Sequence, residues 1–285
     1  MFFLRILSRL PFSVLYLFSD FLFFVSYRLI KYRRKVVLKN LKASFPESDD
    51  ATIKTYEKEF YRNLCDYSVE TLKLLTISKW DLEKRMIYVN PEIIIPYKDK
   101  KQSVIYVTSH QFNWEWLVAA GSIYLPIPVD FVYQPPSSRF FDQLSLRLRT
   151  RFGGHPIKRA DVAREIIRRK DIVRGIAIVA DQFPGHDNDK RYWTTFLNQD
   201  TAFFQGVNQM SYMTQYPVFF AKMNHPRRGY YEVELVKIAE PPYEKGNFDM
   251  IENYIKATEE VIKKNPAGWL WSHNRWKKKR TDSYS

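Results

Sequence analysis

The segment SHQFNWEWL at residues 109–117 holds two side chains that together could perform general base catalysis. His110 directly follows an apolar run, and Glu115 lies five residues further on. An imidazole whose tautomer is fixed by a carboxylate can remove a proton from a hydroxyl or amine nucleophile. On spacing alone, a capping or core histidine at the end of a strand is the more common interpretation.

The geometry of a helix limits where these two residues can lie. Each residue of an ideal helix turns about 100°, so His110 and Glu115 would differ by about 140° and could not share a face. We therefore expect His110 in the turn before a helix, with Ser109 or His110 near the N-cap. Glu115 would then lie in the first turns and reach the imidazole from below.

The elements that position this segment follow from the hydrophobic pattern. Runs rich in β-branched and aromatic residues predict strands at 103–110, 127–134, 175–182, 216–224 and 230–238. Apolar residues at helical spacing predict helices at 47–75, 111–123, 139–151, 161–170, 203–215 and 248–264. This alternation predicts an α/β fold with a mixed sheet flanked by helices. In such sheets reactive groups gather at the carboxyl ends of strands, where His110, Asp181 and Gln182 fall.

The N-terminal region differs from the rest of the chain. Residues 10–27 are almost continuously apolar and carry one charge, Asp20. This length is just short of the ~20 residues that a spanning helix needs. A central Asp costs about 2.5–3.5 kcal/mol on insertion, so a spanning helix and a helix lying in the interface both stay open. We expect a membrane-anchor helix and its basic flank in 1–35 and one main domain in 36–285, the alternative being a buried core helix.

The charge of the chain indicates anionic partners. Forty-five Lys and Arg against 31 Asp and Glu give a net charge of +14, which suits anionic lipid, an acidic protein or nucleic acid. Basic residues directly after the apolar run outnumber those before it, so the main domain is expected on the cytoplasmic side. The single cysteine, Cys65, excludes an intramolecular disulfide and is expected to be a buried thiol.

The C-terminal stretch interleaves tryptophans with basic residues. Trp269, Trp271 and Trp276 alternate with charges that include Arg275, Lys277 and Arg280. Such a pattern could stack single-stranded nucleic acid, lie at the lipid headgroup layer, or complete a core beside a solvated basic tail. The apolar N-terminus favours the lipid interpretation. No recognised nucleic-acid-binding motif is present, so no nucleic-acid partner is expected.

The other histidines predict no metal site. His155 and His225 each precede a proline and are expected in turns, and His273 is expected to be interfacial. No Cys/His cluster has zinc-ligand spacing. Three neighbouring residues also lack the spacing of a calcium loop: His186, Asp187 and Asp189.

Several motifs occur in a definite order along the chain. They are RKVVLKNLKASFPES (34–48), SHQFNWEW (109–116), YQPPSS (133–138), RLRTRFGG (147–154), VADQFPG (179–185), TTFLNQDTAFFQG (194–206) and PAGWLWSHNRWKKKR (266–280). Through this ordered set the chain resembles the lysophospholipid acyltransferase superfamily, specifically the bacterial lipid A late acyltransferases that add lauroyl or myristoyl chains. Two departures are Gln134, where the family often has arginine, and FLNQDTAFF, which replaces a glycine-containing stretch.

The resemblance implies transfer of a fatty acyl group from a thioester on acyl carrier protein to a hydroxyl of a lipid acceptor. The acceptor would be a lipid A precursor or a related glycolipid or aminolipid, and the catalytic domain would face the cytoplasm at the inner membrane. His110 would take the acceptor proton and Glu115 would hold the imidazolium. No metal or other cofactor is implied.

The resemblance also suggests residues that bind substrate. We expect hydrogen-bond donors to the oxyanion or to a lipid phosphate among Arg147, Arg149 and Arg151. The alternative is that these residues form a solvated basic helix face. Asp181 and Gln182 match the family's Asp-Gln position and could order an arginine or the acceptor, with an Asx-turn as the alternative. Coenzyme A as donor, a thioesterase side reaction, and a noncatalytic lipid- or carrier-binding module with the same fold are the other open interpretations.

Overall fold

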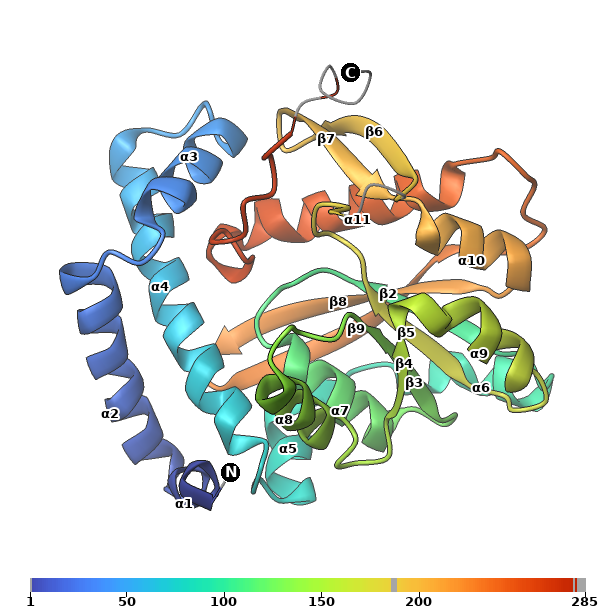
Figure 1. Cartoon of the computed structure of the whole chain (residues 1–285), viewed down its shortest axis with the longest axis horizontal. Helices are drawn as coiled ribbons and strands as arrows, with labels where there is room; N and C mark the ends of the chain where they lie inside the picture. Colours follow the sequence, from blue (N-terminus) through green and yellow to red (C-terminus); the bar gives the residue numbers. More distant parts are fainter. Residues whose placement is uncertain (1, 186–188, 279, 281–285) are drawn as a thin grey trace.

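Runs of β-branched and aromatic residues pair into a seven-stranded sheet at the centre of the molecule (Figure 1). The computed structural model describes residues 2–185, 189–278 and 280. The strand order is β1 (Met86–Tyr88), β9 (Tyr230–Ala239), β8 (Val218–Arg227), β2 (Val104–Thr108), β5 (Gly175–Val179), β3 (Val129–Tyr133) and β4 (His155–Lys158). Only the β8–β9 pair is antiparallel among the paired strands of this sheet. All five expected strands are present, and the mixed α/β sheet is confirmed.

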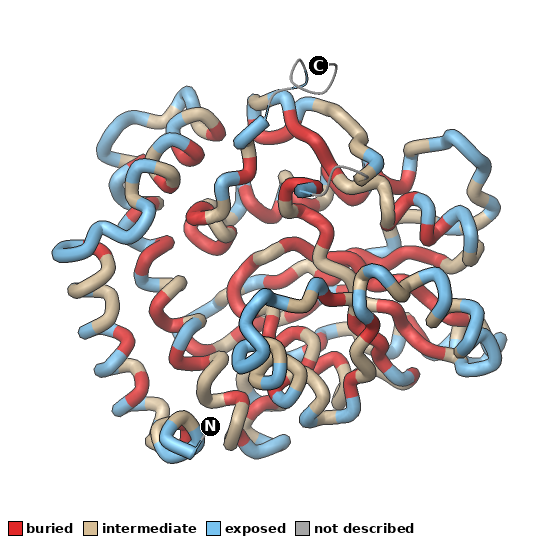
Figure 2. The backbone as a smooth tube through the Cα atoms, in the orientation of Figure 1, coloured by how far each residue is buried: buried red, intermediate tan, exposed pale blue. Residues whose placement is uncertain are grey.

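Helices cover both faces of this sheet. α7 (Trp114–Tyr124) and α8 (Arg139–Arg149) pack on one face, and on the other lie α9 (Val162–Arg168), α10 (Gly206–Thr214) and α11 (Asp249–Lys264). β2 is buried along its whole length (Figure 2). Alternate residues of a strand point to opposite faces, so Ile105 and Val107 join the core beneath α11 while Tyr106 joins the core beneath α7.

Helix α4 (Asp50–Lys73) realises the helix expected at 47–75. Its N-cap is Asp49, whose side chain accepts a hydrogen bond from the Thr52 N–H at 2.8 Å and so satisfies one free amide of the first turn. α3 (Arg34–Ser44) precedes it and packs against it. The expected boundary after residue 35 therefore falls inside α3, and the division into an anchor and one main domain stays a prediction.

The apolar N-terminal segment forms α1 (Phe2–Ser8), α2 (Phe12–Phe23) and a π-helical continuation, η1 (Phe24–Leu29). Residues 12–29 have a mean hydropathy of 1.4 and are long and apolar enough to cross a membrane, with 17% of the stretch buried. α2 packs along α4 (Figure 1). Two of its polar side chains face that helix, because Ser19 donates to Asp66 at 2.6 Å and Tyr16 donates to Glu70 at 2.8 Å. Asp20 instead pairs at 2.7 Å with Arg228, in the turn between β8 and β9.

Other elements were not expected from the sequence. A separate antiparallel hairpin comprises β6 (Arg191–Phe196) and β7 (Gln199–Phe204). The helix expected from residue 203 is wrong at its start, because β7 runs to Phe204 and α10 begins at Gly206. The other short elements are α5 (Lys79–Arg85), η2 (Pro91–Ile94), α6 (Ile95–Asp99), η3 (Arg159–Asp161) and η4 (Pro266–Gly268).

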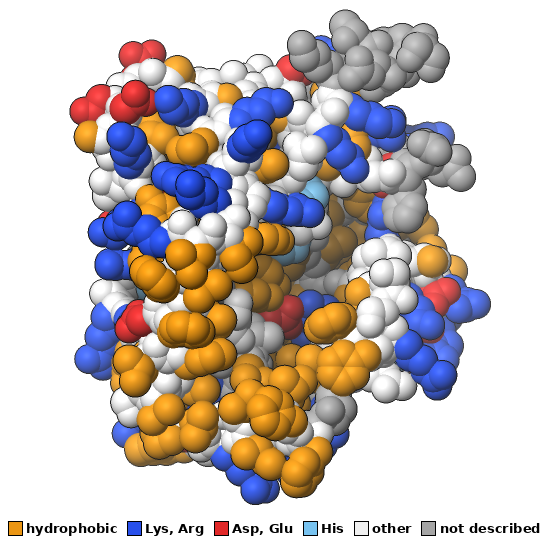
Figure 3. Space-filling model, turned by 60° about the vertical axis from the view of Figure 1, so that its left-hand side comes forward, with side chains coloured by type: hydrophobic (Ala, Val, Ile, Leu, Met, Phe, Trp, Pro, Cys, Tyr) orange, Lys and Arg blue, Asp and Glu red, His pale blue; other side chains and the backbone are white. Residues whose placement is uncertain are grey.

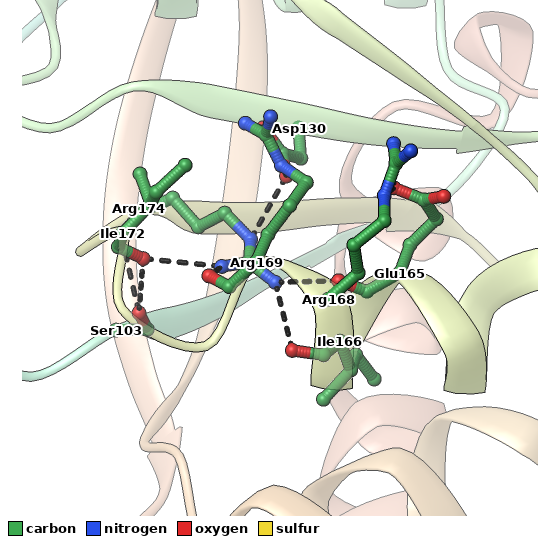
Figure 4. A network of polar contacts seen from close by, with 8 residues as sticks. All are labelled: Ser103, Asp130, Glu165, Ile166, Arg168, Arg169, Ile172 and Arg174. Atoms are coloured by element: carbon green, nitrogen blue, oxygen red, sulfur yellow. Dashed lines mark hydrogen bonds and ion pairs between the residues drawn. The ribbon is translucent and has the colours of Figure 1, made fainter.

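A buried polar network joins the loop before β5 to β3 (Figure 4). Asp130 and Arg174 are both fully buried, and their side chains form an ion pair at 2.8 Å. Arg169 binds both oxygens of the same carboxylate at 3.1 Å. Asp130 alternates with Val129 and Phe131, so it points away from the face that α7 covers. The network therefore holds the connection between α9 and β5 on the face of the sheet opposite to α7.

Candidate active site

His110 lies in the short connection between β2 and α7, as expected from its spacing to Glu115. The N-cap of α7 is Asn113, so Ser109 and His110, expected near the N-cap, lie four and three residues before it. The Asn113 side chain accepts a hydrogen bond from the Trp116 N–H at 3.1 Å. The connection is further held by the Phe112 N–H, which donates to the carbonyl of Gly268 at 3.0 Å.

Asp181 is the carboxylate that holds His110. Its Oδ1 lies 2.5 Å from His110 Nδ1, and its Oδ2 accepts the backbone N–H of His110 at 2.9 Å. The Trp269 indole N–H also donates to Oδ2, at 2.6 Å. Burial raises the pKa of Asp181, but His110 and these hydrogen bonds more than offset it and lower the pKa to about 2. Asp181 is therefore ionised at neutral pH, and its position beside Nδ1 favours the tautomer that carries the proton there.

The other ring nitrogen of His110 faces a cavity. In that tautomer Nε2 has a free lone pair, and the side-chain amide nitrogen of Gln182 lies 3.2 Å from it. Both residues line the cavity. The atom that a general base would use is thus at the cavity wall, in contact with a displaceable amide.

Glu115 makes a different contact from the one expected. Its carboxylate binds Arg149 with both oxygens, at 2.8 Å and 2.5 Å, and within the described residues no hydrogen bond or ion pair joins it to His110. Burial lowers the pKa of the Arg149 guanidinium, but Glu115 more than offsets this and leaves the pKa raised. The orienting contact expected from Glu115 is made by Asp181 instead. The catalytic roles of both carboxylates stay predictions.

The three arginines of the RLRTR segment point in different directions. Arg149 lines the cavity, whereas Arg147 is exposed and Arg151 donates to the carbonyl of Leu74 at 2.8 Å. Residues 147 and 149 both lie on α8, where two steps turn the helix by about 200°. Only one of the three sequence-predicted arginines therefore reaches the site.

The cavity has a volume of about 430 Å³ and lies between α7 and the sheet. Most of its lining is hydrophobic or aromatic, and its polar side chains include His110, Gln134, Arg149, Arg159 and Gln182. Figure 3 shows histidine atoms inside a hollow, with hydrophobic side chains gathered below it. An apolar cavity with a few convergent polar groups at one end suits a ligand with a reactive head and a hydrocarbon tail.

Sequence reasoning missed Arg159, which lines the cavity and pairs with Asp189. Its position directly after β4 could have indicated this role, because the carboxyl end of β4 lies at the same edge of the sheet as His110. Gln134, noted as a departure from the family pattern, also lines the cavity and directly follows β3.

The C-terminal stretch completes the core. Trp269 and Trp271 are buried, and Arg275 is 1% exposed, so the expectation that these residues lie at a lipid interface is wrong. His273 is likewise no interfacial residue, because its Nε2 accepts the Phe183 N–H at 3.3 Å. Burial and the neighbouring Arg275 lower the pKa of His273 to about 4, so it is neutral at physiological pH.

Two further histidines and the single cysteine lie away from the cavity lining. His155 and His225 lie in strands β4 and β8, so the expectation of turns is wrong. Cys65 is buried as expected, and burial raises the pKa of its thiol. His186 and Asp187 lie outside the described residues. Within residues 2–185, 189–278 and 280, no group of three or more His, Cys, Asp or Glu could hold a metal ion.

Comparison with known families identifies a match over nearly the whole chain. A model of the family described as "Bacterial lipid A biosynthesis acyltransferase" matches residues 1–278. No curated protein sequence matches the chain. The matched range includes His110, Asp181 and the whole lining of the cavity.

Proposed function

Since the chain belongs to the bacterial lipid A biosynthesis acyltransferases, we propose that it moves a fatty acyl group from acyl carrier protein to a hydroxyl of a lipid A precursor or a related glycolipid or aminolipid. The observation that carries this proposal is the position of His110. Its Nδ1 is held by Asp181, while its Nε2 faces an apolar cavity of about 430 Å³. A thioester carbonyl beside Nε2 would place its hydrocarbon chain in the cavity.

The chemistry assigned to His110 is general base catalysis. Nε2 takes the proton of the acceptor hydroxyl while the hydroxyl oxygen attacks the thioester carbonyl carbon. The C–S bond then breaks, and the proton on Nε2 passes to the departing thiolate. The Asp181 carboxylate stabilises the imidazolium that forms between these steps, as a buried carboxylate does in hydrolase triads.

Gln182 and Arg149 are the proposed donors to the oxyanion. When an acceptor hydroxyl binds Nε2, it displaces the Gln182 amide, which is then free to donate to the developing negative charge. Arg149 lines the same cavity with its guanidinium held by Glu115. Glu115 would thus act by positioning Arg149 toward an oxyanion or a substrate phosphate, and not by contact with the base.

An acidic acyl carrier protein fits the charge around the cavity. The chain carries a net charge of +14. Lys277 and Arg191 lie over the ring of Phe183, at 4.9 Å and 5.8 Å from its centroid, and Phe183 lines the cavity. We expect carrier binding to weaken with added salt because exposed charges are screened. Binding that does not depend on salt would contradict this docking site.

The membrane side of the proposal rests on α1 and α2. Their outward residues are large and exposed: Phe2, Phe3, Ile6, Val14, Leu17, Phe18 and Phe21. The polar side chains of α2 are engaged by α4 and Arg228. This arrangement suits a helix that lies along the cytoplasmic surface of the inner membrane with its apolar face in lipid. A lipid acceptor would then reach the cavity from the same surface.

Transfer of label tests the proposed function. Purified parent protein and the His110→Ala variant are each incubated with acyl carrier protein that bears a radiolabelled acyl chain, together with extracted host lipids. We expect labelled lipid with the parent only, and the mass of that lipid identifies the acceptor. A binding module without catalysis would instead retain the carrier with both proteins and label no lipid with either.

A further inference from the structure

The cavity extends away from His110 along helix α7. Its lining begins at Trp114, whose ring lies 5.1 Å from the His110 ring between centroids, and continues through Gly121 to Leu125. At 1.5 Å per helical residue, the eleven steps from Trp114 to Leu125 span about 16 Å. The deep end is therefore formed by the last turns of α7 and by the strands beneath them.

Gly121 is the α7 residue whose missing side chain lets Tyr88 pack directly against the helix at this end. A Cβ atom at this position would lie 2.8 Å from Tyr88 Oη and 3.5 Å from Leu125 Cδ1. Tyr88 is itself fixed, because its hydroxyl donates to the Leu117 carbonyl at 3.0 Å. Glycine is unfavourable inside a helix compared with alanine. Close approach of the Tyr88 side chain to the helix gives this glycine a structural reason.

We propose that Gly121 and Tyr88 form the end wall that sets the length of the acyl chain accepted from the donor. The inference rests on the proposed acyl transfer, since it assigns the cavity to the donor chain. With the carbonyl at Nε2 of His110, the chain runs along α7 and its terminal methyl meets Gly121 and Tyr88. The wall admits chains up to that contact and excludes longer ones.

The penalty for a chain that is too long follows from the burial it loses. Each carbon that no longer fits loses about 0.8 kcal/mol of burial, which corresponds to about a fourfold loss in kcat/KM.

Two substitutions at Gly121 and one compensating change test the wall. Gly121→Ala and Gly121→Leu are assayed with carrier proteins that bear saturated chains of increasing length. We expect Gly121→Ala to shorten the preferred chain by about one carbon and Gly121→Leu by about four, in proportion to the added side-chain carbons. In Gly121→Ala with Tyr88→Phe, the atom nearest to the new Cβ is gone, so the preference returns toward that of the parent.

The control substitution is Ser122→Val, which changes the neighbouring α7 residue outside the cavity lining and should leave the preferred length unchanged. His110→Ala is also introduced into the parent and into each Gly121 variant, and the affinity for the same acylated carriers is measured. The preference for chain length is then obtained from binding alone, without acyl transfer. Retained transfer with an unchanged preference in both Gly121 variants would overturn the wall. A change in acceptor preference instead would assign the cavity to the acceptor chain and also overturn it. Length-dependent binding without transfer by the parent would support the wall and contradict the proposed function.

Discussion

At the scale of single residues, the central feature is that a carboxylate distant in sequence holds His110. Asp181 lies 71 residues from His110 and contacts its Nδ1 and its backbone N–H. Sequence spacing favoured Glu115 because it is only five positions away. The pairing of Glu115 with Arg149 depends on how α7 packs against α8, which local spacing does not encode.

The two carboxylates should differ in kinetic effect when each is replaced by its amide. Asp181→Asn keeps the shape of the side chain but removes the negative charge that we propose stabilises the His110 imidazolium. We expect kcat to fall by about 10²- to 10⁴-fold with little change in KM. Glu115→Gln loosens Arg149 and should mainly raise KM for a phosphorylated acceptor. Steady-state kinetics that show the larger kcat loss in Glu115→Gln would reverse the two assignments.

At the scale of elements, the sequence predicts those whose patterns are local. The continuous apolar run of β2 and the helical spacing of α4 and α11 correspond directly to buried faces. The β6–β7 hairpin was missed because its turn residues, Leu197 and Asn198, include no glycine although both have positive φ. The short strands β1 and β4 were missed because three or four residues carry too little pattern. Their places depend on pairing with distant strands.

The buried network around Asp130 predicts a large stability effect. Asp130→Ala leaves Arg174 fully buried without its carboxylate partner, so we expect the free energy of unfolding to fall by about 3–5 kcal/mol. Glu234→Ala is the matched control, because its ion pair with Lys222 is exposed and should contribute at most about 1 kcal/mol. Urea unfolding measures both. Equal losses in the two variants would contradict the role given to the network.

Glu70 joins the N-terminal helix to the active-site connection and should titrate near neutral pH. It is fully buried on α4, and its carboxylate accepts from Tyr16 of α2, Asn113 at the start of α7, and Tyr231 of β9. Burial raises its pKa from 4.5 to about 7, and the hydrogen bonds from these donors only partly offset the shift. The folded state therefore binds this proton more tightly than the unfolded state does.

The sign of the resulting pH dependence follows from that difference. Protonation of Glu70 contributes most to the free energy of unfolding below about pH 4.5. This contribution decreases by up to about 3 kcal/mol as the pH rises toward about 7. Glu70→Gln removes the titration. Urea unfolding at several pH values should show the parent losing stability relative to Glu70→Gln across this window. Parallel pH profiles for the two proteins would contradict a raised pKa at Glu70.

At the scale of the whole molecule, the proposed membrane contact is the exposed apolar surface of α1 and α2. Leu17 and Phe21 are 71% and 59% exposed on α2. Burying either side chain in lipid gains about 1.5–3 kcal/mol, so Leu17→Asp and Phe21→Asp should each lower partitioning into anionic vesicles at least tenfold. Met213→Asp is the control, because Met213 is 60% exposed on α10, away from α1 and α2. Vesicle flotation that shows equal loss in the control would contradict α2 as the membrane contact.

The most direct test of the central claim is the rate of the acyl-transfer step itself. With the acylated carrier protein prebound, lipid acceptor is added in a single turnover and acylated lipid is followed by mass spectrometry for the parent and His110→Ala. The mechanism predicts that His110→Ala lowers the rate by about 10²- to 10⁴-fold while carrier binding is unchanged. Transfer by His110→Ala at the parent rate would show that His110 is not the base.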